Sequence, residues 1–137
     1  MTRTVAVVTA GLSQPSSTRM IGERLAAATD RALRLYDEKV HIEVVELREL
    51  AHEITDNLLA GFASDRLAAA LDTVTRAEGV IAVTPVFNAS YSGLFKSFVD
   101  VLAEDALEGK PVLLAATAGT ARHSLVLEFA MRPLFAH

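Results

Sequence analysis

The feature that most constrains the fold of this chain is an alternation of two apolar patterns. Short apolar runs, typical of strands that are buried on both faces, are each followed by apolar residues at helical spacing. The predicted strands cover residues 4–10, 40–47, 80–84 and 111–117. Residues 40–47 partly alternate between apolar and polar, which is typical of a strand nearer an edge of the sheet. Strands that alternate with helices form a parallel sheet, because right-handed crossovers return the chain to the same end of the sheet. The pattern therefore predicts an α/β fold with a doubly wound parallel sheet.

Helical spacing indicates a helix after each predicted strand. Helices are predicted from Ser17 onward, around residues 67–74, around residues 94–102 and from Ser124 onward. Residues 48–64 have the least regular pattern, and we predict a short helical turn and a loop there. We expect Pro85 to stop the third strand, and Pro133 to kink or break the last helix.

The composition excludes several classes of protein. The 137 residues suffice for one domain, and we expect residues 1–137 to form it. The net charge of −4 argues against a nucleic-acid partner, which would require a basic surface. No apolar run approaches the roughly 20 residues that span a bilayer, so no membrane partner is expected. The chain has no cysteine and its histidines lack ligand spacing, so we predict no metal site and a cytoplasmic location.

A loop rich in hydroxyl groups joins the first predicted strand to the first predicted helix. Ligands of doubly wound sheets bind at the carboxyl ends of the strands, which is where this loop lies. The N–H groups at a helix start attract anions, and a phosphate monoester has three terminal oxygens to accept from hydroxyl donors. The hydroxyl residues are Ser13, Ser16, Ser17 and Thr18. The loop matches neither the P-loop nor the dinucleotide fingerprint, and the plainer alternative is a serine-rich helix cap.

Two further loops lie at the same edge of the predicted sheet. Residues 85–92 begin with a proline and present backbone N–H and C=O groups on a stiff rim, which suits a planar heterocycle. Residues 118–123 contain Gly119, which allows the backbone to approach a flat ligand closely. The plainer alternatives are two ordinary turns whose following helices are capped by Ser92 and Ser124.

Together the three loops resemble those of the NADPH-dependent FMN reductase family, which has a flavodoxin-like fold. The segment P-V-F-N-A-S-Y-S-G-L-F-K, from Pro85 to Lys96, is similar to the segment that follows the third strand in this family. The resemblance covers essentially the whole chain and implies the strand order 2-1-3-4. Leu12 and Gln14 stand where the family's first loop often has serine and arginine, and whether Arg19 compensates stays open.

The resemblance implies an FMN site that is formed by all three loops. Ser13, Ser16, Ser17 and Thr18 would bind the phosphate of FMN. Pro85, Val86, Phe87, Asn88 and Ser90 would line the isoalloxazine, with Thr117, Gly119 and Thr120 on its other side. NADPH is the second cofactor that the family implies. Because hydride passes directly from nicotinamide to flavin, no catalytic side chain is predicted.

The resemblance also implies partners and an assembly. Within the family the chain is most similar to reductases that supply reduced flavin to a monooxygenase, and a homodimer or homotetramer is expected. Family members continue through a fifth strand and a final helix, so we expect that the fifth strand is missing because the chain is truncated. Two alternatives stay open: an NAD(P)H-dependent quinone or azo reductase, and a non-enzymatic electron carrier of the flavodoxin type.

Overall fold

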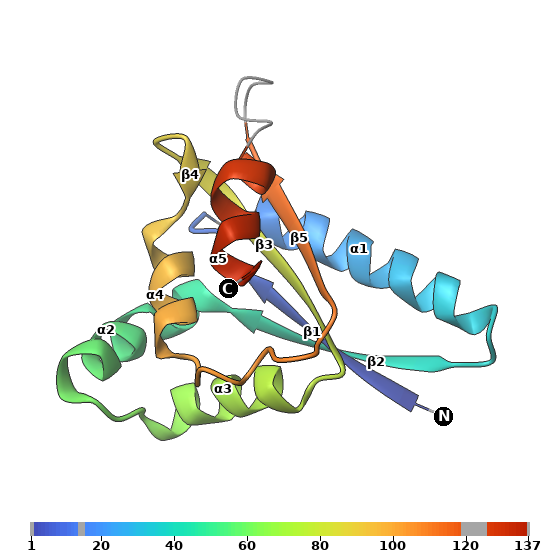
Figure 1. Cartoon of the computed structure of the whole chain (residues 1–137), viewed down its shortest axis with the longest axis horizontal. Coiled ribbons are helices and arrows are strands. Elements are labelled where there is room, and N and C mark those ends of the chain that lie inside the picture. The colour runs from blue at the N-terminus through green and yellow to red at the C-terminus, as the bar shows by residue number, and fades with distance from the viewer. Residues whose placement is uncertain (1, 14–15, 119–125, 137) are drawn as a thin grey trace.

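The computed structural model describes residues 2–13, 16–118 and 126–136 and contains one central parallel sheet (Figure 1). Its parallel strands are β1 (Thr2–Thr9), β2 (Lys39–Glu46), β3 (Gly79–Phe87) and β5 (Val112–Thr117). They lie in the order β2-β1-β3-β5, and a short strand β4 (Ser90–Tyr91) pairs with β3 in the antiparallel direction. The predicted strand order 2-1-3-4 is therefore confirmed, with β5 as the fourth parallel strand.

Helices cover both faces of the sheet, as the alternating pattern predicted. The helix α1 (Ser17–Arg34) covers one face. On the other face lie α2 (Ala51–Ala60), α3 (Asp65–Arg76), α4 (Gly93–Val101) and α5 (Arg132–Ala136). Within the described residues, no helix is both long enough and apolar enough to cross a membrane.

The strand β1 shows how one strand serves both layers. Val5 and Val7 belong to the core beneath α1, whereas Ala6 and Val8 belong to the core on the opposite face. The helix α1 approaches β1 closely at Gly22, where a Cβ atom would lie 2.8 Å from Cγ1 of Val7. This close packing fixes the position of α1, and with it the position of its N-terminus at the carboxyl edge of the sheet.

The prediction of a short helical turn and a loop across residues 48–64 was wrong in its larger part, because most of the stretch is helical. A 3₁₀ turn (Leu47–Leu50) leads into α2, and Gly61 ends that helix with a left-handed φ of 86°. Leu47, Leu50 and Ile54 are all buried, and their spacing places them on one helical face.

Two proline positions also differ in detail from the prediction. The strand β3 runs through Pro85 to Phe87, because Pro85 lies beyond the last pair that β3 forms with β1, at Val83. A strand with a neighbour on only one side tolerates a proline. Pro133 was predicted to kink or break the last helix, but α5 runs through it, and a π-helical turn (Leu127–Met131) precedes α5.

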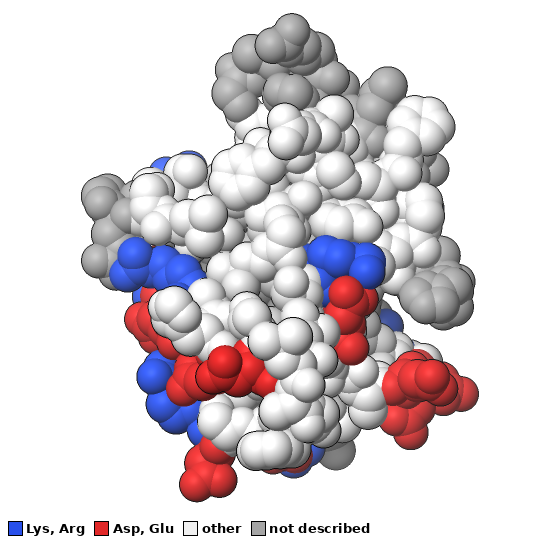
Figure 2. Space-filling view, turned by 90° about the vertical axis from the view of Figure 1, so that its left-hand side faces the viewer, with Lys and Arg blue, Asp and Glu red and all other residues white. Residues whose placement is uncertain are grey.

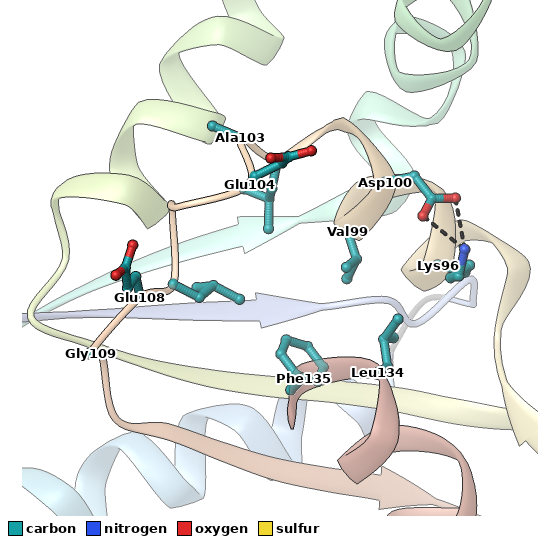
Figure 3. A pocket seen from close by; sticks show the side chains of 11 residues that line it. Lys96, Val99, Asp100, Ala103, Glu104, Glu108, Gly109, Leu134 and Phe135 are labelled. Atoms are coloured by element: carbon teal, nitrogen blue, oxygen red, sulfur yellow. Dashed lines mark hydrogen bonds and ion pairs between the residues drawn. The ribbon is translucent and has the colours of Figure 1, made fainter. Parts of the chain in front are cut away.

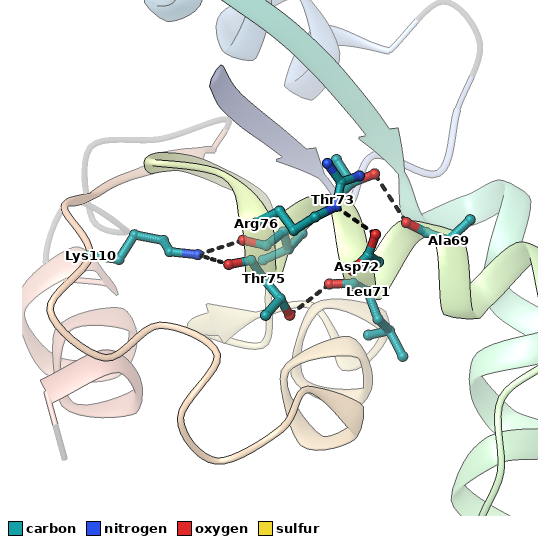
Figure 4. A network of polar contacts seen from close by, with 8 residues as sticks. Ala69, Leu71, Asp72, Thr73, Thr75, Arg76 and Lys110 are labelled. Carbon is teal, nitrogen blue, oxygen red and sulfur yellow. Dashed lines mark hydrogen bonds and ion pairs between the residues drawn. The ribbon is translucent and has the colours of Figure 1, made fainter. Parts of the chain in front are cut away.

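Lys110 connects the segment before β5 to the end of α3 (Figure 4). Its Nζ donates hydrogen bonds to the carbonyl oxygens of Val74 and Thr75, both at 2.7 Å. The last carbonyls of a helix have no partner within the helix, so the ammonium group satisfies acceptors that would otherwise need water. Burial lowers the pKa of Lys110 below its ordinary value.

Candidate functional site

The structure brings the ends of β1, β3 and β5 together at one edge of the sheet. The backbone N–H of Ala10, directly after β1, donates to the carbonyl oxygen of Val83 at 3.0 Å. The hydroxyl groups of Thr18 and Thr117 lie 3.0 Å apart, although 99 positions separate them in the chain. The first loop therefore lies next to the end of β5, as the sequence predicted. The predicted site residues Gly119 and Thr120 lie outside the described residues.

Ser16 is the N-cap of α1. Its Oγ accepts a hydrogen bond from the backbone N–H of Arg19 at 3.1 Å, and its side chain is buried. A Cβ atom on Gly11 would overlap this Oγ and would lie 3.1 Å from Cβ of Thr18. Gly11 is therefore required for space at this loop, and the helix-cap interpretation holds for Ser16.

The other predicted phosphate residues differ in their exposure. Ser13 and Ser17 are exposed at the start of α1, whereas Thr18 is buried and its hydroxyl pairs with Thr117. The helix α1 has 18 residues, and its first N–H groups precede the first bond within the helix. The partial positive charge of this terminus favours an anion beside Ser17.

Thr9, the last residue of β1, is a site residue that the sequence reasoning missed. It is 1% exposed, and its Oγ1 has no hydrogen-bond partner among the described residues. A buried hydroxyl without a partner is costly, so such a group at the rim of a sheet marks a place for a ligand or a water. The available signal was a hydroxyl residue at the end of an apolar strand, directly before the glycine loop.

Arg19 is engaged by two carboxylates. Its Nε donates to Oε1 of Glu23 at 2.9 Å, and its Nη1 donates to Oε2 of Glu46 at 2.9 Å. The hydrogen bond to Glu23, followed by the attraction of Glu46, raises the pKa of Arg19 above its ordinary value. Arg19 thus does not supply the loop with an unpaired positive charge. The sequence reasoning did not anticipate either glutamate.

Beyond β3 the second loop forms a tight hairpin. Val86 pairs with Tyr91 and Phe87 with Ser90, which leaves Asn88 and Ala89 as the two turn residues. Their φ values of 50° and 61° are both left-handed, as a type I′ turn requires. Phe87 is 46% exposed, whereas Pro85 and Val86 are half-buried.

Side-chain hydrogen bonds fix the base of this hairpin. The Oγ1 of Thr84 accepts from the backbone N–H of Ser92 at 3.0 Å and donates to the carbonyl oxygen of Pro85 at 2.8 Å. Ser92 caps α4, because its Oγ accepts from the N–H of Phe95. The capping role that the sequence offered as the plainer alternative is therefore confirmed for Ser92.

A hollow of about 710 Å³ lies elsewhere, between α4, α5 and the segment that leads to β5 (Figure 3). Lys96 also lines the hollow, and its Nζ forms an i, i+4 ion pair with Oδ1 of Asp100 at 2.8 Å. Glu104 and Glu108 also line the hollow, and carboxylates of this kind disfavour a phosphate group. We therefore do not assign the flavin to this hollow.

The sheet edge that carries the hairpin differs from this hollow in its surface charge. On the face shown in Figure 2, uncharged residues cover the upper part, at the height of the hairpin, and charged residues gather below it. A helix start with exposed hydroxyls, beside a hairpin that presents backbone groups and an aromatic side chain, suits a flat ligand with a phosphate tail.

Comparison with known proteins agrees with this arrangement. The sequence profile described as NADPH-dependent FMN reductase matches residues 3–137. An FMN reductase (NADPH) from Pseudomonas aeruginosa is 37% identical over 131 residues, which cover 96% of this chain and 68% of that protein. An NADH-dependent FMN reductase, SfnE, from Pseudomonas putida is 36% identical over 133 residues, again covering 96% and 68%.

The chain is also similar to solved structures of oxidoreductases. An oxidoreductase from Corynebacterium diphtheriae is 43% identical with a TM-score of 0.96, and the match covers 98% of this chain and 74% of that one. The apo form of the NADH:FMN oxidoreductase EmoB is 32% identical with a TM-score of 0.82, covering 96% and 67%. On the profile match and these identities, the chain belongs to the NADPH-dependent FMN reductase family.

Proposed function

We propose that this chain transfers a hydride from NAD(P)H to FMN held at the carboxyl edge of its sheet, and so supplies reduced FMN. Family membership carries the reaction: the chain is an NAD(P)H-dependent FMN reductase with FMN and NADPH as cofactors. The observation that supports the position of the site is the contact of Thr18 with Thr117. It joins the start of α1 to the end of β5, while the buried Thr9 ends the neighbouring part of the sheet in β1.

The phosphate of FMN is assigned to the start of α1. Ser13 and Ser17 present exposed hydroxyls there, and Ser16 keeps the first turn in place through its bond to the N–H of Arg19. The Oγ of Ser16 accepts that bond and retains its own proton for donation. The tight fit around Gly11 and the unpartnered hydroxyl of Thr9 are what a cradle for such a group requires.

The ring is assigned to the hairpin. Phe87 offers an apolar face, and the backbone of Pro85, Val86, Asn88 and Ser90 offers hydrogen-bonding groups; Thr117, Gly119 and Thr120 are assigned to the other side. When bound, FMN would supply the redox chemistry by accepting hydride from the nicotinamide. The part of this chain is to hold the two rings together and to exclude water, so it needs no side-chain acid or base.

The assembly and the recipient are also part of this proposal. We place the chain in a homodimer or homotetramer in the cytoplasm, with a flavin-dependent monooxygenase as the recipient of reduced FMN. The strong exposure of Leu59, at 84%, and Phe62, at 73%, supports a subunit contact near the end of α2. The absence of cysteine from the chain fits a reducing compartment.

Steady-state oxidation of NADPH and NADH by the purified protein tests the function. We expect saturable turnover with free FMN as acceptor. Turnover only with a quinone or an azo dye would instead favour the quinone or azo reductase. Tight retention of FMN without any oxidation of NADPH or NADH would favour the electron carrier.

A further inference from the structure

We propose that Glu46 determines how strongly this site favours phosphorylated over unphosphorylated flavins. Its carboxylate binds Arg19 and leaves the surroundings of the flavin phosphate with a negative balance of charge. The inference rests on the proposed function, because it concerns the same phosphate site. It goes further by assigning a specificity-determining role to a residue that lies outside all three loops.

The contact between the two residues is direct. Nη1 of Arg19 lies 2.9 Å from Oε2 of Glu46, and Nε of Arg19 lies 2.9 Å from Oε1 of Glu23. Arg19 stands in the first turn of α1, where its own N–H bonds to the cap at Ser16. Its guanidinium therefore starts from the helix turn assigned to the phosphate but points to carboxylates on its own helix and on β2.

Glu46 lies at the same edge of the sheet as the proposed site, because it ends β2. It is the last residue of β2 and pairs in register with Thr9, the last residue of β1. Its side chain is only 9% exposed, so water screens its charge poorly. Thr9 next to it has a buried hydroxyl with no partner in the part of the chain that the structure describes, which independently marks this end of the sheet as a place for a ligand.

The sum of charges in this cluster decides its effect on an anion. One guanidinium and two carboxylates give a net charge of −1 beside the start of α1. The α1 terminus attracts a phosphate through its N–H groups, and this cluster opposes that attraction. Because the phosphate of FMN gains little net electrostatic energy, the ring and the ribityl chain dominate binding. Riboflavin, which shares both but lacks the phosphate, should then bind almost as well as FMN.

The variant Glu46→Gln tests the proposal. It keeps the shape and a hydrogen-bond acceptor for Arg19 but removes one negative charge. We expect the Kd for FMN, measured by quenching of flavin fluorescence, to fall about fivefold, because the variant removes a Coulomb repulsion at a partly screened site. The Kd for riboflavin should stay unchanged, because riboflavin carries no charge at the phosphate position.

Glu23→Gln is the matched control. It makes the same chemical change at the other partner of Arg19, but Glu23 is 52% exposed and water screens it well. Its effect on the FMN Kd should therefore be clearly smaller than that of Glu46→Gln. An equal shift for FMN and riboflavin in Glu46→Gln, or no shift for either, would overturn the proposal.

A second measurement uses the unchanged protein and does not depend on the folding of a variant. When salt rises from about 0.05 to about 0.5 M, the FMN Kd should stay constant or fall, because screening weakens a repulsion. A Kd that rises with salt would show a net electrostatic attraction for the phosphate and would refute the negative balance of charge assigned to Glu46. If the protein binds neither flavin, the proposed function fails, which is a different outcome from these.

Discussion

The two ends of the candidate site are built by different means. At the start of α1, buried side-chain contacts fix the loop: Ser16 caps the helix beneath Gly11, and Thr18 bonds to Thr117. At the hairpin, the backbone turn sets the shape, through left-handed φ values at Asn88 and Ala89. The phosphate end should therefore be sensitive to side-chain changes in distant strands, and the ring end to changes in local backbone preference.

The largest effect is expected at Gly11. The change Gly11→Ala puts a Cβ into the Oγ of Ser16, so the cap or the loop must move, at a cost of about 2 kcal/mol in the free energy of unfolding. The FMN affinity should fall with it. Urea unfolding and an FMN titration measure the two effects. Gly93→Ala is the control, because among the described residues no atom outside its chain neighbours and its own helix backbone lies within 4 Å of its Cβ position, and its stability should not fall.

The Thr18–Thr117 pair should show a coupling that the hairpin lacks. Thr18→Val and Thr117→Val each remove one hydroxyl from a pair 3.0 Å apart, and each should cost about 1 kcal/mol of stability. The double variant should cost less than the sum of the two, since either single change already breaks the bond. Strictly additive values would mean that the two hydroxyls do not stabilise this edge.

Variants at Ser16 and Ser17 test helix capping and ligand binding one at a time. Ser16→Ala removes the acceptor for the N–H of Arg19 and should lower stability by about 1 kcal/mol. Ser17 is exposed and follows the N-cap, so Ser17→Ala should change stability by less than about 0.5 kcal/mol yet weaken FMN binding. An unchanged FMN Kd in Ser17→Ala would remove that residue from the phosphate site.

The smallest effect is expected at the hairpin tip. Ala89 holds a φ of 61°, which costs a residue with a Cβ more than it costs glycine. The change Ala89→Gly should therefore raise the free energy of unfolding by about 0.5 kcal/mol. Asn88→Gly serves as the comparison, and its gain should be smaller because asparagine tolerates this conformation. A loss of stability in Ala89→Gly would contradict a strained turn.

The layers of the fold were predicted correctly from the sequence, whereas the helix within residues 48–64 was missed. The central strands β1 and β3 carry runs of buried apolar residues and give a clear signal, whereas α2 mixes the buried Ile54 with the exposed Leu58 and Leu59. Exposed leucines beside buried ones blur the helical period, so the helix was missed. The full length of β3 depends on where β1 ends, which is a property of the sheet and not of Pro85 alone.

For the site, the sequence indicated the three loops but not how their hydroxyls are used. Ser16 and Thr18 were both predicted to bind phosphate, yet each already has a protein partner. One of those partners, Thr117, lies 99 positions away, and no local pattern reveals such a contact. The ion pair of Glu46 with Arg19 could not be predicted from a local pattern either, because it forms only when β2 lies beside β1 in the sheet.

The contact of Lys110 with α3 has a consequence for chemical modification of the protein. A single ammonium group holds the carbonyls of Val74 and Thr75, which lie 36 and 35 positions earlier in the chain. Acetylation of this lysine would remove both the charge and most of the donors, and would free the entry into β5 from the helix. Because β5 begins at Val112, just after this lysine, and ends at Thr117, Lys110 anchors the strand at the end opposite the candidate site.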